Sequence, residues 1–235
     1  MHNPFPHPLI LGHRGAPYDA PENTLRAFAA ALEQGADGVE LDVQRARDGV
    51  PVIVHDDDLE RTHAVRGRVA DHEWPAIERL TSAGLPSLEQ AAAWAAASGA
   101  WLNVEIKAPR VEAATLEILR ATRLLERTFV SSFDPAVVAE VGRLAPEVLR
   151  FLVTEEWDTA AQNALAESDA HGVCLHVDAA TALNLEVLHN DALPIVVWTV
   201  DTPARIRELL EAGVAAIITN RPRVAAEVRR EVVGE

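Results

Sequence analysis

Residues 9 to 43 read LILGHRGAPYDAPENTLRAFAAALEQGADGVELDV, and this stretch holds the pattern that decides the fold. It begins with a short apolar run, Leu9 to Gly12, and ends with a second one, Gly38 to Val43, both of the length of buried strands. Between them, Glu22 to Gln34 has helical periodicity. Gly35 follows directly, where a left-handed helix C-cap is favoured before the chain turns. The stretch therefore predicts one strand–helix–strand unit.

The same alternation continues along the rest of the chain. Further strands are predicted at Leu102 to Lys107, Phe129 to Ser132, Leu149 to Val153, Gly172 to His176, Pro194 to Val200 and Ala215 to Thr219. Further helices are predicted at Ser87 to Ala97, Arg110 to Leu124, Pro135 to Leu144, Thr159 to Ala166, Thr181 to His189 and Pro203 to Glu211. About eight strand–helix alternations in one domain, residues 1–235, favour an α/β fold of the (β/α)8 TIM-barrel type, and a doubly wound open sheet is the alternative.

One apolar run, Val50 to His55, breaks this alternation. It follows the second strand too closely for a crossover helix, so we expect it to return antiparallel to that strand. Asp48-Gly49 is a favoured two-residue hairpin turn, which would pair Arg47 with Val50. Counting outward from that turn pairs Val43 with Val54 and sets His55 beside Asp42. Residues 56–85 then predict a short, polar and irregular loop excursion over the barrel mouth.

Composition restricts the partners. The formal net charge is -15, so the overall field repels polyanions and argues against a nucleic-acid or anionic-membrane partner. No apolar run approaches the roughly 20 residues that cross a bilayer. The first residues also lack the pattern of a secretion signal, so we expect a cytoplasmic protein without stable membrane insertion. The single cysteine, Cys174, excludes an intramolecular disulfide and lies between apolar neighbours, which predicts a buried position.

Three carboxylates lie on predicted strands in a pattern typical of a metal site. Glu40 and Asp42 are two residues apart, so both project to one face of their strand. Glu105 repeats the pattern on the next barrel strand and shares its face with Lys107. Buried carboxylates repel one another unless a cation lies between them, and an all-oxygen set suits Ca²⁺ or Mg²⁺. The alternatives are a solvent-facing polar strand face and, for Lys107, a purely structural ion pair.

Histidine and arginine residues add candidate catalytic groups at the same barrel mouth. His13 and Arg14 follow the first strand, and the carboxyl ends of strands are where a barrel keeps its active site. A histidine can be acid or base near neutral pH, and an arginine can bind a phosphate in a bidentate manner. With His55 near Asp42, two histidines would provide one acid and one base on either side of a scissile bond. Taken alone, His13 is more typical of a loop or capping residue than of a catalytic one.

Three further residues are weaker candidates. Glu22 and Asn23 open the first long helix, where such side chains commonly cap the terminal amides, so helix capping and ligand contact are both open. Trp198 lies near the end of the seventh predicted barrel strand, where its ring would face either a substrate or the core.

Together these residues resemble the glycerophosphodiester phosphodiesterase family over nearly the whole chain, Leu9 to Pro222. The motifs that carry the resemblance are Leu11 to Gly15, Pro21 to Thr24, Gly38 to Val43, Asp48 to Asp56, Leu59 to Thr62, Pro86 to Leu88, Val104 to Lys107 and Trp198 to Val200. Two positions depart from the usual pattern. His63 stands where many relatives have a threonine, and Asn220 stands where an aspartate is frequent. These departures leave the substrate head group open.

The resemblance implies a (β/α)8 barrel that binds a divalent ion, Ca²⁺ or Mg²⁺, through Glu40, Asp42 and Glu105. It also implies catalysis by His13 and His55. The expected reaction is hydrolysis of a small-molecule glycerophosphodiester to sn-glycerol 3-phosphate and an alcohol, with Arg14 and Lys107 holding the phosphate. The alternatives are a lysophospholipase D-type diesterase on the same fold and a non-catalytic barrel that binds phosphorylated ligands. The oligomeric state, the identity of the nucleophile and the acid and base roles of the two histidines stay open.

Overall fold

The computed structural model describes residues 3–82 and 84–234. Its central sheet is a closed barrel, because β1 pairs in parallel with both β9 and β2. Among the described residues, the parallel barrel strands are β1 (Leu9–His13), β2 (Gly38–Arg45), β4 (Trp101–Ile106), β5 (Thr128–Ser132), β6 (Leu149–Thr154), β7 (Gly172–His176), β8 (Ile195–Trp198) and β9 (Ala216–Thr219). The predicted TIM barrel is confirmed, and the open sheet is excluded by the β1–β2 pairing.

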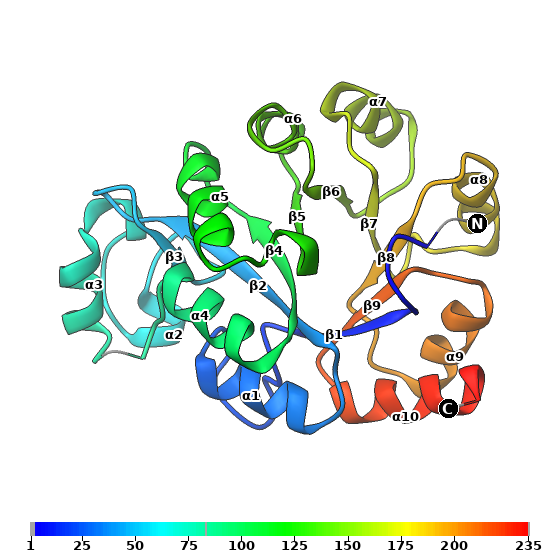
Figure 1. The fold of residues 1–235 in the computed structure, drawn as a ribbon, viewed down its shortest axis with the longest axis horizontal. Helices are drawn as coiled ribbons and strands as arrows, with labels where there is room; N and C mark the ends of the chain where they lie inside the picture. The colour runs from blue at the N-terminus through cyan, green and yellow to red at the C-terminus, as the bar shows by residue number, and fades with distance from the viewer. Residues whose placement is uncertain (1–2, 83, 235) are drawn as a thin grey trace.

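Helices surround the strands in Figure 1. Those between or after barrel strands are α1 (Leu25–Glu33), α4 (Leu88–Ser98), α5 (Glu112–Ala121), α6 (Pro135–Leu144), α7 (Thr159–Ser168), α8 (Ala182–Asn190), α9 (Pro203–Glu211) and α10 (Pro222–Val233). Several begin at a side chain that accepts a hydrogen bond from the first turn, as Thr24 does for α1 and Asp134 for α6. α10 was not predicted from the sequence; it begins at a proline and buries Ala225 and Val228.

The hairpin after β2 exists, but its predicted register is wrong by one residue. β3 (Pro51–Ile53) runs antiparallel to β2 and pairs Val43 with Ile53 instead of Val54. The loop is three residues long rather than two, because Ala46 pairs with Val50 and Gly49 adopts a left-handed conformation at φ 89°. His55 is therefore not the cross-strand neighbour of Asp42, whose carbonyl accepts from the N–H of Val54 at 3.0 Å.

The excursion after β3 is more ordered than predicted. It contains α2 (Glu60–His63), a 3₁₀ turn (Val69–Asp71) and α3 (Trp74–Leu80), which lie beside β3 in Figure 1. The excursion has a small core of its own, in which Leu59, Ile77 and Leu85 pack on Val52 of β3. Apolar contacts therefore fix this segment against the barrel.

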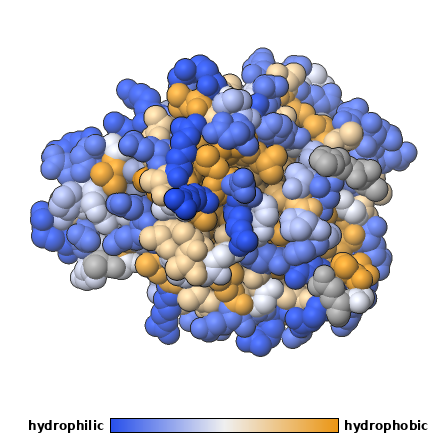
Figure 2. Space-filling model, viewed as in Figure 1, coloured by the Kyte–Doolittle hydropathy of each residue, from blue (hydrophilic) through white to orange (hydrophobic). Residues whose placement is uncertain are grey.

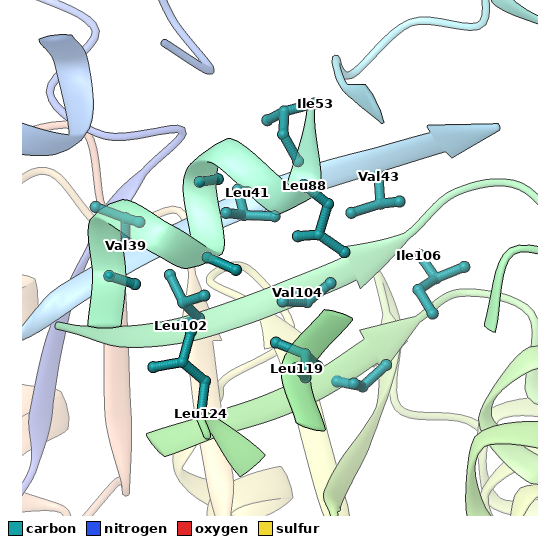
Figure 3. Close-up of a cluster of buried hydrophobic side chains, with 14 of the residues drawn as sticks. Val39, Leu41, Val43, Ile53, Leu88, Leu102, Val104, Ile106, Leu119 and Leu124 are labelled. Carbon is teal, nitrogen blue, oxygen red and sulfur yellow. The ribbon is translucent and has the colours of Figure 1, made fainter. Parts of the chain in front are cut away.

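The main core lies between the strands and the helices. Figure 3 shows Leu41 of β2 and Val104 of β4 packed together with Leu88 of α4 and Leu119 of α5. Because side chains alternate along a strand, the residues between these apolar ones face the barrel interior. Phe5, Phe129 and Phe151 pack against one another in a second cluster with Leu9 and Leu11 of β1.

The surface is mainly polar at its periphery. In Figure 2 hydrophilic side chains surround most of the visible face, with apolar atoms exposed between them toward the middle. Within residues 3–82 and 84–234, no helix combines the length and the apolar character that a bilayer-spanning segment needs.

Candidate active site

Three carboxylates converge inside the barrel at the carboxyl ends of β2 and β4. Asp42 and Glu105 are register partners in the β2–β4 pair, and Glu40 lies two residues before Asp42 on the same face. One carboxylate oxygen from each residue lies within 4.8 Å of the others. Only 2% of Glu40 and 1% of Asp42 is exposed. All three predicted metal ligands are thus brought together.

The electrostatics of this cluster favour binding of a cation. Burial, and then the charges of Asp42 and Glu105, raise the pKa of Glu40 well above its usual value. Burial, followed by the charge of Asp42, likewise raises the pKa of Glu105. A divalent cation between the three carboxylates would relieve this repulsion, and its hard character matches an all-oxygen donor set. The residues present therefore fit the implied Ca²⁺ or Mg²⁺ ion.

Both predicted cationic residues lie against the carboxylates. Lys107 Nζ donates to Glu105 Oε1 at 2.8 Å and lies 3.6 Å from Asp42 Oδ1. Arg14 Nε lies 3.3 Å from Asp42 Oδ2, and its backbone N–H donates to Glu40 Oε2 at 2.9 Å. Two positively charged side chains therefore border the three clustered carboxylates.

A glycine allows Arg14 to approach the cluster. The chain turns sharply after β1, where the N–H of Gly15 donates to the carbonyl of Gly12 at 3.1 Å. Gly15 has φ 90°, and a Cβ there would lie 2.5 Å from the carbonyl carbon of Ala27. A larger residue would push the loop away from α1 and move Arg14 with it.

The two predicted catalytic histidines line the same cavity. The cavity has a volume of about 260 Å³, and His13, His55, Arg14, Lys107 and all three carboxylates are among its lining residues. His13 lies at the end of β1, and burial followed by the charge of Arg14 lowers its pKa. His55 lies just after β3, and its Nδ1 is 2.7 Å from Asp56 Oδ1. His55 therefore lies in the site although the predicted hairpin register was wrong.

Two predicted residues support the cluster rather than cap α1, because Thr24 is the N-cap. Asn23 is 4% exposed, and its Nδ2 donates to Asp42 Oδ2 at 2.8 Å. Glu22 accepts hydrogen bonds from Arg61 and Arg14, and these contacts, that of Arg61 first, lower its pKa to about 2. Both side chains therefore fix groups that line or border the cavity.

Trp198 ends β8 and forms one wall of the cavity. Its indole N–H donates to the carbonyl of Cys174 at 3.0 Å, which fixes the ring. Its ring meets Phe133 edge to face at a centroid distance of 5.6 Å. Lys107 Nζ lies 5.5 Å from the centre of the Phe133 ring, so an aromatic wall adjoins the cationic one.

Sequence reasoning missed several residues of the site. Asp56 holds His55, and Asn220 Oδ1 lies 2.8 Å from Nδ1 of His13. Cys174 is buried, as predicted, but it also lines the cavity, and burial raises the pKa of its thiol well above the usual value. Additional lining residues that were not predicted are Asn103, Ser131, Phe133, Val153, Glu155 and Ile218. Asp56 had a local signal because it follows His55 directly, and Asn103 had one because it lies two residues before Glu105 on the same strand face.

Known proteins are similar to this chain in sequence and in fold. The profile of the glycerophosphoryl diester phosphodiesterase family matches residues 13–224. A glycerophosphodiester phosphodiesterase of Bacillus altitudinis is 30% identical, with 95% of this chain and 98% of the relative covered. A crystal structure of the glycerophosphodiester phosphodiesterase from Agrobacterium tumefaciens str. C58 is similar at 28% identity and a TM-score of 0.81, covering 94% of this chain and 99% of the other.

A second solved structure gives the same result. The glycerophosphodiester phosphodiesterase from Thermotoga maritima has a TM-score of 0.81 at 26% identity, covering 96% of this chain and 100% of that one. The matches extend over the barrel and over the strand ends that carry the carboxylates and histidines. The chain therefore belongs to the glycerophosphoryl diester phosphodiesterase family and is an enzyme of that class.

Proposed function

We propose that this enzyme uses a divalent ion, Ca²⁺ or Mg²⁺, and two histidines to hydrolyse small glycerophosphodiesters to sn-glycerol 3-phosphate and an alcohol. The observation that carries the proposal is one cavity lined by three clustered carboxylates, two of them buried, together with two histidines, an arginine and a lysine. Carboxylates alone would repel a phosphodiester. The same carboxylates around a divalent ion, bordered by Arg14 and Lys107, provide a positive surface for it.

Each group has a defined task in this proposal. Glu40, Asp42 and Glu105 would hold the ion, which supplies Lewis-acid stabilisation of negative charge on the phosphate. Arg14 and Lys107 bind the phosphate oxygens and stabilise the charge that develops on them in the transition state. This role is supported by the ion pairs that hold Arg14 and Lys107 against the carboxylates, because side chains held in place need little reorganisation when a substrate binds.

Proton transfer is assigned to the histidines. As the nucleophilic oxygen forms its bond to phosphorus, one imidazole accepts the proton of that oxygen. As the bond from phosphorus to the departing alcohol breaks, the other imidazole donates a proton to the alcohol oxygen. Their different partners, the amide of Asn220 for His13 and the carboxylate of Asp56 for His55, place the rings in different electrostatic surroundings.

The proposal is tested by product analysis. Purified protein with Mg²⁺ or Ca²⁺ is expected to release sn-glycerol 3-phosphate from glycerophosphocholine, glycerophosphoethanolamine and glycerophosphoglycerol, as measured with a stereospecific dehydrogenase. A phosphate monoester serves as the control for phosphatase activity and should not be hydrolysed. Release of lysophosphatidic acid from lysophosphatidylcholine in preference to these products would point to a lysophospholipase D-type reaction instead, and binding without turnover would contradict catalysis.

Arg61 provides a test of how His55 is held. Its guanidinium bridges Asp56, the partner of His55, and Glu22, the partner of Arg14. The hydrogen bond from Arg61 is the main reason that the pKa of Asp56 falls to about 2. Because the bridge is half-exposed, we expect Arg61→Ala to lower kcat by about fivefold, the equivalent of about 1 kcal/mol, with metal affinity retained.

Arg68→Ala is the matched control for this variant. Arg68 pairs with the exposed Asp57 in the same excursion, and within the described part of the chain no hydrogen bond or ion pair joins it to Asp56 or Asn220. Steady-state kinetics of the two variants should therefore differ, with Arg68→Ala close to wild type. Equal losses in both would mean that the excursion responds to any lost ion pair and that Arg61 has no special role.

A further inference from the structure

A chain of hydrogen bonds leads from His13 away from the cavity. Asn220 Oδ1 lies 2.8 Å from His13 Nδ1, and Asn220 Nδ2 donates to Asp201 Oδ2 at 2.8 Å. Asp201 lies just after β8, and Asn220 lies just after β9. Neither Asp201 nor Asn220 is among the residues that line the cavity, so the chain acts on His13 from behind.

Asp201 determines which way the amide of Asn220 points. Its other oxygen, Oδ1, accepts from the backbone N–H of Asn220 at 2.8 Å and from Thr219 Oγ1 at 3.0 Å. The carboxylate is thus fixed in place, and an ionised carboxylate only accepts hydrogen bonds. A flipped amide would bring the oxygen of Asn220 against Asp201 Oδ2, two acceptors with no proton between them. The NH₂ group of Asn220 therefore faces Asp201, and its oxygen faces His13.

The orientation of the amide determines the tautomer of His13. The amide oxygen is an acceptor, so the ring nitrogen that meets it must carry a proton. We propose that Asp201 and Asn220 are positioning residues that together hold neutral His13 in the tautomer protonated at Nδ1. Nε2 is then the nitrogen through which His13 exchanges its proton during catalysis. The catalytic part of this inference depends on the proposed two-histidine reaction, but the tautomer itself does not.

The decisive variant is Asp201→Asn, which replaces an acceptor by a donor without changing size. The new amide keeps its oxygen on the backbone N–H of Asn220 and directs its NH₂ group at Asn220 Nδ2. Two donors then face each other, and the amide of Asn220 turns its oxygen toward position 201. Its NH₂ group now meets His13, which accepts only if Nδ1 has lost its proton. We expect the tautomer to switch to protonation at Nε2.

Two readouts follow this switch. In ¹⁵N NMR spectra of histidine-labelled protein at pH 8, with the signals assigned through a His13→Ala spectrum, the shifts of Nδ1 and Nε2 should exchange in Asp201→Asn. The same variant should lose about 10²-fold in kcat, within the range of a general acid–base contribution, while KM changes little because neither residue lines the cavity.

The exchange variant Asp201→Asn/Asn220→Asp restores the pattern and is the key control. The amide at position 201 can still accept from the backbone and from Thr219, and it now donates to a carboxylate at position 220 that accepts from His13. Every hydrogen bond of the chain is kept, and only the bond between positions 201 and 220 has its donor and acceptor exchanged. We expect the tautomer protonated at Nδ1 to return, with most of the lost kcat. Thr219→Val removes a hydrogen bond to Asp201 without changing the amide, so it should keep the wild-type tautomer.

Failure of the tautomer inference and failure of the two-histidine reaction would give different results. A wild-type protein protonated at Nε2 of His13, or an Asp201→Asn variant that keeps the Nδ1 proton and full kcat, would overturn the inference. So would an exchange variant that folds, as judged by circular dichroism, but remains as impaired as Asp201→Asn. If Asp201→Asn fails to fold, the tautomer in the exchange variant decides alone. Normal turnover in His13→Ala would instead reject the two-histidine reaction and leave the tautomer result standing.

Discussion

His13→Ala and His55→Ala are each expected to lower kcat by about 10²- to 10⁴-fold, the range that a positioned acid or base contributes. Both imidazoles line the cavity that holds the carboxylate cluster, and each has its Nδ1 occupied by a separate partner. Because one ring accepts and the other donates a proton, neither can replace the other within one turnover. Steady-state kinetics with glycerophosphocholine at saturating metal would measure the loss.

The chemistry of the leaving group separates the two roles. A substrate with a 4-nitrophenol leaving group needs little protonation, so it should restore much of kcat in the variant that lacks the acid and little in the other. His176→Ala is a matched control, because His176 contacts Trp198 from the end of β7 but does not line this cavity. Near-normal turnover in either catalytic variant would exclude acid–base catalysis by that ring.

The barrel could be predicted from the sequence because its signal is local and repeated. Each apolar run of strand length is followed by a helical pattern, and many helices have their own start or stop residue, such as Ser87 before α4 and Gly99 after it. The register of the β2–β3 hairpin could not be predicted with the same accuracy. Asp48-Gly49 fits a two-residue turn as well as the end of a three-residue loop. The two-residue type I′ turn would need a positive φ at Asp48 as well as at Gly49, and of these two described residues only Gly49 has one.

Two of the helices that sequence reasoning missed, α2 and α3, are stabilised by distant contacts. The short helices α2 and α3 have no side-chain cap, and Leu59 and Ile77 bury themselves only where β3 lies beneath them. A polar segment of this kind has little intrinsic helical preference, so its structure depends on tertiary packing. α10, in contrast, did have a signal in its starting Pro222 and in the spacing of its apolar residues.

In the candidate site, too, some residues could be predicted from local patterns and others could not. Strand alternation was sufficient to put Glu40 and Asp42 on one face, and the carboxyl ends of the strands indicated where His13 belongs. The contact of His13 with Asn220 joins residues 207 positions apart. It exists only because β9 pairs with β1 to close the barrel. Partners of that kind cannot be predicted from local spacing.

Glu40→Gln is expected to abolish most of the response to metal while leaving the metal-free protein at least as stable as wild type. Without an ion, Glu40 is repelled by Asp42 and Glu105, which is why its pKa is raised beyond the effect of burial. The amide keeps the volume of the carboxylate, and its oxygen can still accept from the backbone N–H of Arg14. It removes one negative charge from the cluster, so the repulsion falls together with the attraction for a cation.

Thermal unfolding with and without metal would measure both effects. An ion present at 100 times its Kd stabilises the native state by about 2.7 kcal/mol, which corresponds to a rise in Tm of roughly 5–10 °C for a protein of this size. Wild-type protein stripped with a chelator should show such a rise with Ca²⁺ or Mg²⁺ and regain its activity. Glu40→Gln should show little of either. Glu155→Gln, which removes an exposed carboxylate from the same cavity, should keep the full rise in Tm. An equal response in Glu40→Gln and wild type would mean that the three carboxylates do not share a cation, and the repulsion between them would then have to be relieved by protonation of Glu40.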